Sequence, residues 1–457
     1  MKKISFIKLS ILASALVWFS CQKQIDKEPT GQNELQSAAR AQDQGHLKQT
    51  KTYSADVAQK WQDLQNRFLR TPTSANPFGR HGHRWFAYCG VALYESVVAG
   101  MPGYQSLHGQ LTDMPEMPAT EPGKAYHWPT AANAALAYMN KQFFGNLPAD
   151  SISLMVSLEN TLNAEYQSEI NNAATFQRSK DFGRTVAERI YNWSTTDGSL
   201  TVYPPYVPPA LPQWNNTPPN PSGIADPYWG KNRLMVPGST TGTASPLPPT
   251  YSTDPNSDYY KMVKEVYDVS QKLTAADSAT ALYYRDQPGF QAGTAYVSMF
   301  NQVMHQENPQ LDFYALAHVK AGIALYESMI NCWKIKYEVL VDRPIRYIRT
   351  VLNHPNWNPL FTTPGHPDFP SGHSQNGGAF AAVMTSIFGD NYQFTLHTYD
   401  NLGMAPRTYN SFNEMAVDVG KSRVLAGIHY TYSCVEGKRQ GEKIAANILN
   451  TLKFTKE

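Results

Sequence analysis

One seven-residue segment occurs twice, and this repeat constrains the fold more than any other feature of the chain. Residues 90–96 read Gly-Val-Ala-Leu-Tyr-Glu-Ser, and residues 322–328 read Gly-Ile-Ala-Leu-Tyr-Glu-Ser. Residues 143–146 (Phe-Phe-Gly-Asn) have a weaker counterpart at 387–390 (Ile-Phe-Gly-Asp). Apolar residues recur at helical spacing through both halves, whereas strand-like alternation is scarce. The repeat indicates duplication. We therefore predict an all-α protein built from two related helical bundles of the four-helix type.

A proline-rich stretch separates the two halves. Prolines stand at positions 204, 205, 208, 209, 212, 218, 219 and 221, and a Gly/Ser/Thr/Pro-rich run follows from 237 to 255. So many prolines exclude helix and predict a long irregular connection. With 457 residues, 42% of them hydrophobic, the chain can bury the cores of two domains. We expect an N-terminal structural bundle at 53–198, a Pro/Gly-rich linker at 199–256 and a C-terminal bundle at 257–457.

The N-terminus has the pattern of an export signal. Basic residues at positions 2 and 3 precede a mostly apolar run from Leu9 to Phe19, and Ser20 comes just before Cys21. Residues 1–20 therefore read as a signal that is removed, and 21–52 as a polar tether. The junction resembles that of bacterial lipoproteins, although Trp18 and Phe19 depart from its usual residues. The resemblance implies a lipid anchor at Cys21 in the cell envelope, on the periplasmic or outer-membrane surface. Plain secretion is the alternative.

Charge and cysteine content exclude several classes of protein. The formal net charge is only +2, with no basic block beyond the N-terminus, which argues against a nucleic-acid partner. No apolar run after the signal is long enough to span a bilayer. Cys89, Cys332 and Cys434 remain once Cys21 is set aside, so at most one disulfide is possible, and their spacing matches no metal motif. We expect buried thiols and favour a monomer.

The first chemical motif pairs a lysine with an arginine. Lys336 and Arg343 are seven residues apart, so on one helix both would project from the same face, with Pro344 ending the helix at Arg343. Shifting by the repeat interval places Tyr104 and Leu111 opposite them in the first half. We therefore expect the second bundle to carry the site and the first to be structural. Taken alone, the motif is also compatible with a solvated basic face.

The second motif is Pro370-Ser371-Gly372-His373. Ser371 is a natural N-cap, and a helix of small residues is predicted from Gly372 to Phe388. Backbone N–H groups at a helix start bind anions, and His373 would stand in the first turn beside the anion. A capped helix with an incidental histidine is the alternative for this motif alone.

The third motif is Ser422-Arg423 followed by His429. On an ideal helix Arg423 and His429 would point about 120° apart, which suits a five-coordinate centre approached equatorially by the guanidinium and axially by the imidazole. Gly427, on the face of Arg423, would leave room for an anion. Together, the motifs predict a pocket for a tetrahedral oxyanion.

The three motifs, in this order, resemble the signature that joins type 2 phosphatidic acid phosphatases with vanadium-dependent haloperoxidases. The haloperoxidase resemblance extends over nearly the whole mature chain and implies a vanadate cofactor. Vanadate would be held by Lys336, Arg343, Ser371, Gly372, His373, Arg423 and His429. His429 would bind vanadium, His373 would deprotonate hydrogen peroxide and Lys336 would polarise the activated peroxide. Iodide or bromide would then be oxidised to hypohalous acid.

The same resemblance implies roles for neighbouring residues. Trp333 and His366 resemble positions that line the halide and peroxide pocket, and a histidine at the second is typical of bromoperoxidases. Asp286 resembles an acidic residue that steadies the arginine of the third motif. Ser433 departs from the pattern, because relatives usually have an aspartate there to orient the histidine one turn before it.

Two other functions fit the sequence. A soluble acid phosphatase of the same superfamily would use His429 as nucleophile and His373 as the acid that protonates the leaving alcohol. Alternatively, a surface lipoprotein would bind a partner or a divalent metal through His366, Asp368, His373 and His429. Three nearby cations oppose a divalent metal there.

Overall fold

The computed structural model describes residues 48–70, 78–216, 223–285 and 295–456. The predicted export signal, most of the predicted tether and Asp286 lie outside these residues. None of the described helices is long and apolar enough to cross a membrane.

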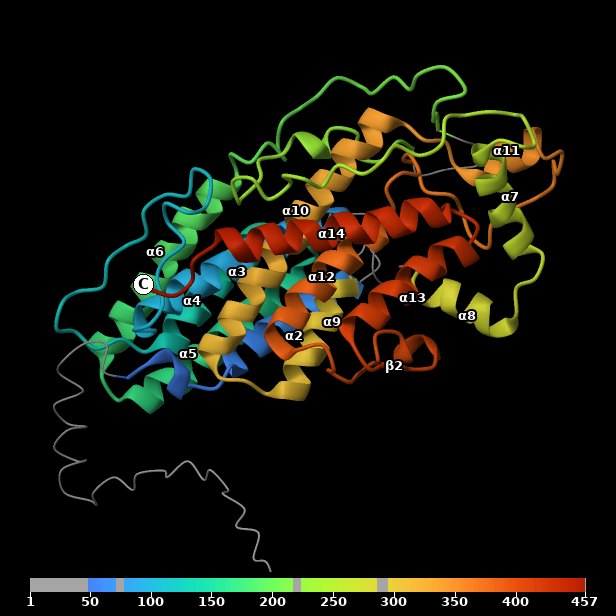
Figure 1. The fold of residues 1–457 in the computed structure, drawn as a ribbon. Helices are drawn as coiled ribbons and strands as arrows, with labels where there is room; N and C mark the ends of the chain where they lie inside the picture. Colours follow the sequence, from blue (N-terminus) through green and yellow to red (C-terminus); the bar gives the residue numbers. More distant parts are fainter. Residues whose placement is uncertain (1–47, 71–77, 217–222, 286–294, 457) are drawn as a thin grey trace, which may run out of the picture.

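Helices dominate both halves, as predicted (Figure 1). The first half contains α2 (Asp56–Arg70), α3 (Phe78–Val97), α4 (Trp128–Phe143), α5 (Ala149–Ile170) and α6 (Ala173–Ser194). The second contains α7 (Asp258–Ser270), α8 (Ala275–Tyr283), α9 (Ala295–Glu307), α10 (Leu311–Val339), α11 (Pro344–Thr350), α12 (Gly372–Phe388), α13 (Phe412–Leu425) and α14 (Thr431–Thr451). The sequence did not predict the short antiparallel hairpin of β1 (Phe394–Leu396) and β2 (Arg407–Tyr409).

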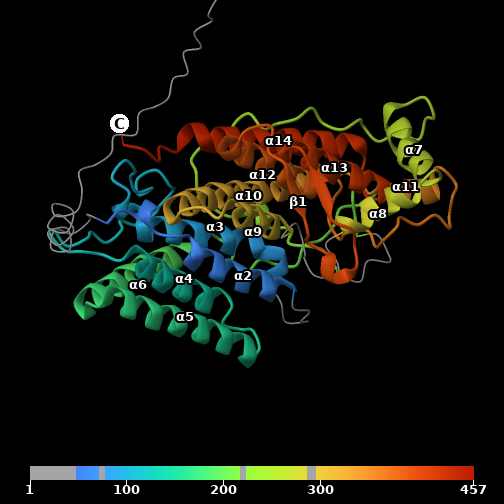
Figure 2. The same ribbon diagram turned by 90° about the horizontal axis from the view of Figure 1, so that it is seen from below.

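The helices lie in layers, and the repeated segments meet in the middle one. In Figure 2, α4, α5 and α6 lie on one side of α2, α3, α9 and α10, and α12, α13 and α14 lie on the other. Gly90 on α3 and Gly322 on α10 allow a close crossing of the two backbones. A Cβ on Gly322 would stand 2.8 Å from the Cα of Ala87, and one on Gly90 would stand 3.1 Å from the Cα of Val319. The repeat therefore builds the contact between the two halves.

The glutamates of the repeat, Glu95 and Glu327, each accept hydrogen bonds from a neighbouring loop. Glu95 accepts a hydrogen bond from the backbone N–H of Leu107 at 2.7 Å. Glu327 accepts one from the N–H of Val236 at 3.1 Å and further ones from the N–H of Met235 and the hydroxyl of Ser239. Each carboxyl thus holds a loop against its helix. Burial raises the pKa of both to about 7, against the hydrogen bonds that lower it.

One continuous hydrophobic core runs through both halves. The same cluster contains Trp61 and Tyr88 from the first half and Tyr326 and Phe380 from the second. A smaller cluster joins α7 to α11. The two helical units therefore share a core, although the sequence divides them by a linker.

The proline-rich segment lies along the site half of α10. Its described residues between α6 and α7 form one short 3-10 turn, Trp229–Lys231. The carbonyl of Ala225 accepts hydrogen bonds from Trp333 Nε1 at 3.3 Å and from the Tyr337 hydroxyl at 2.6 Å. Irregular chain thus covers the part of α10 that carries the first motif.

The three described cysteines, Cys89, Cys332 and Cys434, are free and buried, as we expected. Burial raises the pKa of Cys332 to about 11 and that of Cys434 to about 12, and it also raises that of Cys89.

Candidate active site

The two cations of the first motif reach the same segment of the chain, but they do not lie on one helix as predicted. α10 ends at Val339, and Leu340 adopts the left-handed conformation with φ 56°. Arg343 has extended backbone and is the N-cap of α11. The prediction that one helix carries both Lys336 and Arg343 was therefore wrong. A turn out of α10 redirects the chain, and both side chains still reach the segment 366–368.

Lys336 is fully buried near the end of α10. Its Nζ donates hydrogen bonds to the carbonyls of Pro367 at 2.7 Å and Asp368 at 2.9 Å. The pKa of Lys336 is lowered to about 7, chiefly by burial and also by Arg343, whereas Cys332 and Asp368 act in the opposite direction. The ammonium is thus desolvated and lies beside a second cation.

Arg343 is equally buried and holds several segments together. Its guanidinium donates to the carbonyls of His366 at 2.8 Å and Ile428 at 2.6 Å. It also approaches His366 Nδ1 at 3.0 Å and His429 Nε2 at 3.1 Å. Burial lowers the pKa of Arg343 to about 10, so the group stays charged at neutral pH. One side chain therefore orders both histidines.

The second motif forms the predicted helix start. α12 begins at Gly372, and the N-cap hydroxyl of Ser371 accepts from the backbone N–H of Ser374. The N–H of Ser371 donates to the carbonyl of Ser433 at 3.0 Å, which fixes this turn against α14. His373 stands in the first turn of α12 and is half-buried.

The third motif is not one helix. α13 ends at Leu425, and Gly427 takes φ 78°, which favours glycine. A Cβ there would also lie 3.0 Å from the ring of Trp357. Gly427 therefore allows the turn. We had expected it to leave space for an anion instead. This turn, not a 120° helical offset, directs His429 toward Arg343.

Arg423 is buried, with 3% of its surface exposed. Its guanidinium donates to the carbonyl of Tyr284 and lies 5.4 Å from the ring centroid of Phe361. The predicted partner, Asp286, follows two residues after Tyr284 but lies outside the described residues. The pairing of Asp286 with Arg423 stays a prediction.

Trp333 and His366 are neighbours. Their ring centroids are 5.0 Å apart with planes inclined by 43°. Trp333 is buried on α10, three residues before Lys336, whereas His366 is half-buried. Burial lowers the pKa of His366 well below its usual value, and Lys336 and Arg343 lower it further. The pair forms a neutral, partly apolar wall beside the cations.

The sequence reading missed the carboxylate that serves His429. Asp368 is fully buried, and its Oδ1 lies 3.0 Å from His429 Nδ1. Its Oδ2 accepts a hydrogen bond from the Ser433 hydroxyl. Asp368 stands two residues before Pro370 of the second motif, which is the one sequence signal that could have placed it near the site. We had considered it only as a metal ligand.

The electrostatic balance of the cluster favours an anion. Lys336, Arg343 and Arg423 are all buried, and Asp368 is the carboxylate that contacts this group, 3.8 Å from Arg343. Asp342 is also buried nearby, but it pairs with a further cation, Arg346, at 3.3 Å. Buried charge of one sign is costly without a counter-charge. The three buried cations therefore suit the site to an anionic ligand.

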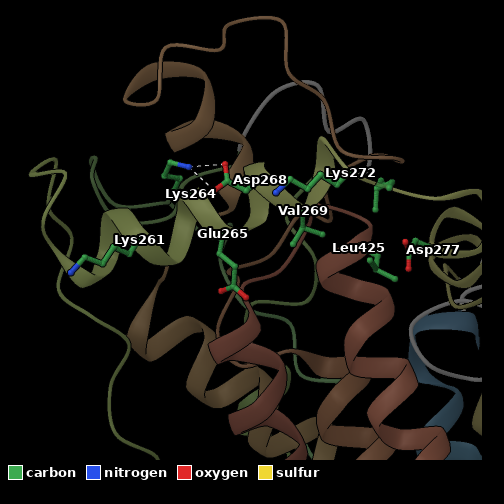
Figure 3. Close-up of a pocket in the computed structure, with 9 residues that line it drawn as sticks. Lys261, Lys264, Glu265, Asp268, Val269, Lys272, Asp277 and Leu425 are labelled. Carbon is green, nitrogen blue, oxygen red and sulfur yellow. Dashed lines mark hydrogen bonds and ion pairs between the residues drawn. The ribbon is translucent and has the colours of Figure 1, made fainter.

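Two other possible sites do not match this chemistry. Figure 3 shows a groove of about 480 Å³ between α7, α8 and α13, where Lys264 pairs with Asp268 at 2.5 Å. Acids and lysines alternate there, so the groove is no anion pocket. Among the described residues, no three or more His, Cys, Asp or Glu side chains are grouped to hold a metal ion. The set His366, Asp368, His373 and His429 thus forms no such group.

Comparisons with known proteins agree with the site. Residues 317–456 match the family model described as the VCPO second helical-bundle domain. A segment of 100 residues is 31% identical to the vanadium-dependent bromoperoxidase of Ascophyllum nodosum, covering 19% of this chain and 18% of that protein. The structure of the first bacterial vanadium-dependent iodoperoxidase superposes with a TM-score of 0.79 at 28% identity, covering 88% of this chain and 98% of that one. The chain is thus similar to vanadium-dependent haloperoxidases, in sequence over part of its length and in fold over most of it.

The family likeness extends to both halves. An apo-type bacterial vanadium-dependent chloroperoxidase matches with a TM-score of 0.62 over 82% of this chain and 94% of that one, at 12% identity. That likeness concerns the fold alone. Within this fold, the three motifs of the chain meet near the ends of α10 and α13 and the start of α12.

Proposed function

We propose that this protein is a vanadate-dependent haloperoxidase that oxidises iodide or bromide with hydrogen peroxide to hypohalous acid. The observation that carries the proposal is the buried group of Lys336, Arg343 and Arg423 around a neutral histidine, at the start of α12. The likeness to a bacterial iodoperoxidase and an algal bromoperoxidase supports it.

The residues present fit vanadate. Vanadate is an oxyanion, and Lys336, Arg343 and Arg423 are buried cationic side chains that can surround it. His429 is held neutral, because burial and the nearby Arg343 and Lys336 lower its pKa well below the usual range. A neutral imidazole with a lone pair at Nε2 can coordinate a metal. Lys336, Arg343, Ser371, Gly372, His373 and Arg423 would hold the oxygens, and His429 would be the protein ligand of vanadium.

Each side chain has a definite part in the chemistry. When bound, vanadate supplies the Lewis acidity that activates hydrogen peroxide toward halide without a change of metal oxidation state. His373, half-buried at the start of α12, can accept a proton from the entering peroxide. Lys336 presents a desolvated ammonium that stabilises negative charge. Arg343 fixes the two other histidines and stays charged throughout.

The wall beside the cations supports the easily oxidised halides. Iodide and bromide are large and weakly hydrated, and the neighbouring rings of Trp333 and His366 offer a polarisable surface next to the cations. The lowered pKa of His366 keeps this wall uncharged. The wall therefore adds no positive charge that would favour chloride, which is smaller and more strongly hydrated. Iodide and bromide are therefore the substrates proposed here.

One assay separates this function from the phosphatase. Metal-free protein is incubated with vanadate and tested for oxidation of iodide and bromide by hydrogen peroxide. In parallel, hydrolysis of a phosphate ester is measured without vanadate. We expect vanadate-dependent oxidation that His429→Ala and Lys336→Ala abolish. Phosphate-ester hydrolysis that vanadate inhibits, with no halide oxidation, would show the phosphatase instead, and inactivity in both assays would leave a binding protein.

We also propose that the mature chain is exported and anchored through a lipid at Cys21. The support is the order of basic residues, apolar run, small residue and cysteine at the N-terminus. The hydrogen peroxide and halide would then be met in the cell envelope. A monomer is the proposed state.

A further inference from the structure

His429 is oriented by a residue far from it in sequence. The imidazole follows the turn after α13, and Asp368 belongs to the segment before α12. Even so, His429 Nδ1 and Asp368 Oδ1 are 3.0 Å apart and both side chains are buried. The two atoms are within hydrogen-bond distance but are not aligned for a linear bond.

The contact on the opposite ring nitrogen shows which tautomer Asp368 faces in this arrangement. Arg343 Nη1 lies 3.1 Å from His429 Nε2, and a guanidinium has donors but no acceptor. Nε2 must therefore present its lone pair, which places the ring hydrogen on Nδ1, facing Asp368. The nitrogen left with a lone pair is the one directed into the cation cluster.

Ser433 explains how Asp368 keeps its own orientation. The Ser433 hydroxyl donates to Asp368 Oδ2, which leaves Oδ1 toward the imidazole. The N–H of Asp368 donates to the carbonyl of Val341 at 2.9 Å, and Lys336 binds the Asp368 carbonyl rather than its carboxylate. Both ends of this acidic residue are thus fixed. Arg343, at 3.8 Å, is the cation nearest its carboxylate in the described contacts.

The geometry points to Asp368 as the positioning residue of His429, with Ser433 holding Asp368 in place of an aspartate at position 433. The carboxylate comes from the segment before α12, and position 433 supplies the hydroxyl that anchors it. The effect on vanadate binding rests on the proposed function, whereas the effect on the tautomer does not.

The first experiment measures the tautomer without vanadate. The 12 histidines are labelled with ¹⁵N, and the His429 signals are identified by their loss in His429→Gln. We expect the parent protein to show a protonated Nδ1 and a non-protonated Nε2. Asp368→Ser should mix the two tautomers. The double variant Asp368→Ser/Ser433→Asp should restore the parent pattern, because it returns a carboxylate to the helix one turn after His429.

The second experiment measures vanadate affinity by titration calorimetry. Asp368→Ser should weaken binding about 10- to 100-fold, as is usual when the partner of a metal-binding histidine is lost. Ser433→Ala keeps the carboxylate and removes one hydrogen bond, so we expect a smaller loss of about 3- to 10-fold. The double variant should recover most of the affinity lost in Asp368→Ser.

Specific results would overturn the inference. An unchanged tautomer in Asp368→Ser would show that Asp368 does not orient His429. Weakened binding in Asp368→Ser that the double variant fails to restore, with the tautomer intact, would reduce Asp368 to a counter-charge for Arg343. If Asp368→Ser does not fold, Ser433→Ala decides by the same two readouts, and unchanged values there would contradict the inference. Absence of vanadate binding in the parent would defeat the proposed function, yet the tautomer measurement would still decide the role of Asp368.

Discussion

The contacts of Arg343 depend on the shape of its guanidinium as well as on its charge. The guanidinium contacts two carbonyls and two imidazoles from a single buried position. A lysine would keep the charge but not the planar, multi-pronged geometry. The arginine therefore acts as a template for the site as well as a cation.

We expect Arg343→Lys to weaken vanadate binding by about 10- to 100-fold, because both histidines lose a common donor. Titration calorimetry with metal-free protein measures the change. Arg346→Lys is the matched control, since Arg346 stands three residues later and contacts Asp342 and Asn215 rather than the histidines. Its affinity should stay within about threefold of the parent. Equal losses in both variants would contradict the special role of Arg343.

The sequence predicted which residues form the site far better than which partners their side chains contact. Ser371 and the start of α12 were predicted correctly because capping depends on neighbouring residues. Asp368 was missed as the partner of His429, because its contact depends on how distant segments pack. No periodicity or local motif signals such a pairing.

At the scale of elements, the errors arose where helices end. We had placed the first and the third motif each on a continuous helix. In the structure, a left-handed residue turns the chain within each motif: Leu340 in the first and Gly427 in the third. A leucine is an unusual residue for that conformation, so nothing local warned of the first break. The two copies of the repeat, in contrast, lie on helices that cross each other closely, α3 and α10.

The α3/α10 crossing gives a prediction about packing. Gly322→Ala would place a Cβ 2.8 Å from the Cα of Ala87, where only backbone can move. We expect the free energy of unfolding to fall by about 1–3 kcal/mol, measured by urea denaturation followed by tryptophan fluorescence. Gly103→Ala is the control, because nothing lies within 4 Å of its added Cβ. A Gly322→Ala protein as stable as this control would show that the helices can separate at no cost.

The paired glutamates give a prediction about pH. The pKa of Glu327 is about 7 in the folded chain against an ordinary 4.5, so its stabilising contribution is full below pH 4.5 and is lost as pH rises through 7. Glu327→Gln does not ionise. The free energy of unfolding of the parent, relative to Glu327→Gln, should therefore drop on the order of 1–3 kcal/mol between about pH 4.5 and 7.5. Glu95→Gln should behave alike, and a difference independent of pH in urea denaturation would refute the assignment.

At the scale of the whole molecule, the shared core makes the first half a support for the second. Trp61 and Tyr88 belong to the same cluster as Tyr326 and Phe380, so the bundle that carries the site shares its main core with the first half. The cations of the site come from α10 onward, and no tether residue among those described contributes to it. Anchoring and binding should therefore be independent.

We expect Cys21→Ser to move the protein from the membrane fraction to the soluble fraction of the cell envelope, because a lipid chain supplies the proposed attachment. Vanadate affinity per mole should remain within about twofold of the parent, since residues 336 to 433 form the site. Fractionation with immunoblotting, and calorimetry on the purified proteins, measure the two effects. A Cys21→Ser protein that stays with membranes would contradict the lipid anchor.

The buried thiols bear on how long such a protein can work. Cys332 Sγ would lie 3.6 Å from a Cβ on Gly372, next to the proposed place where hypohalous acid is made. Oxidants of this kind attack thiolates far more readily than thiols. Burial raises the pKa of Cys332 to about 11 and keeps the sulfur protonated and covered. The packing that positions α10 against α12 would thereby also shield this thiol from the proposed product, so loosening that helix contact should shorten the working life of the protein.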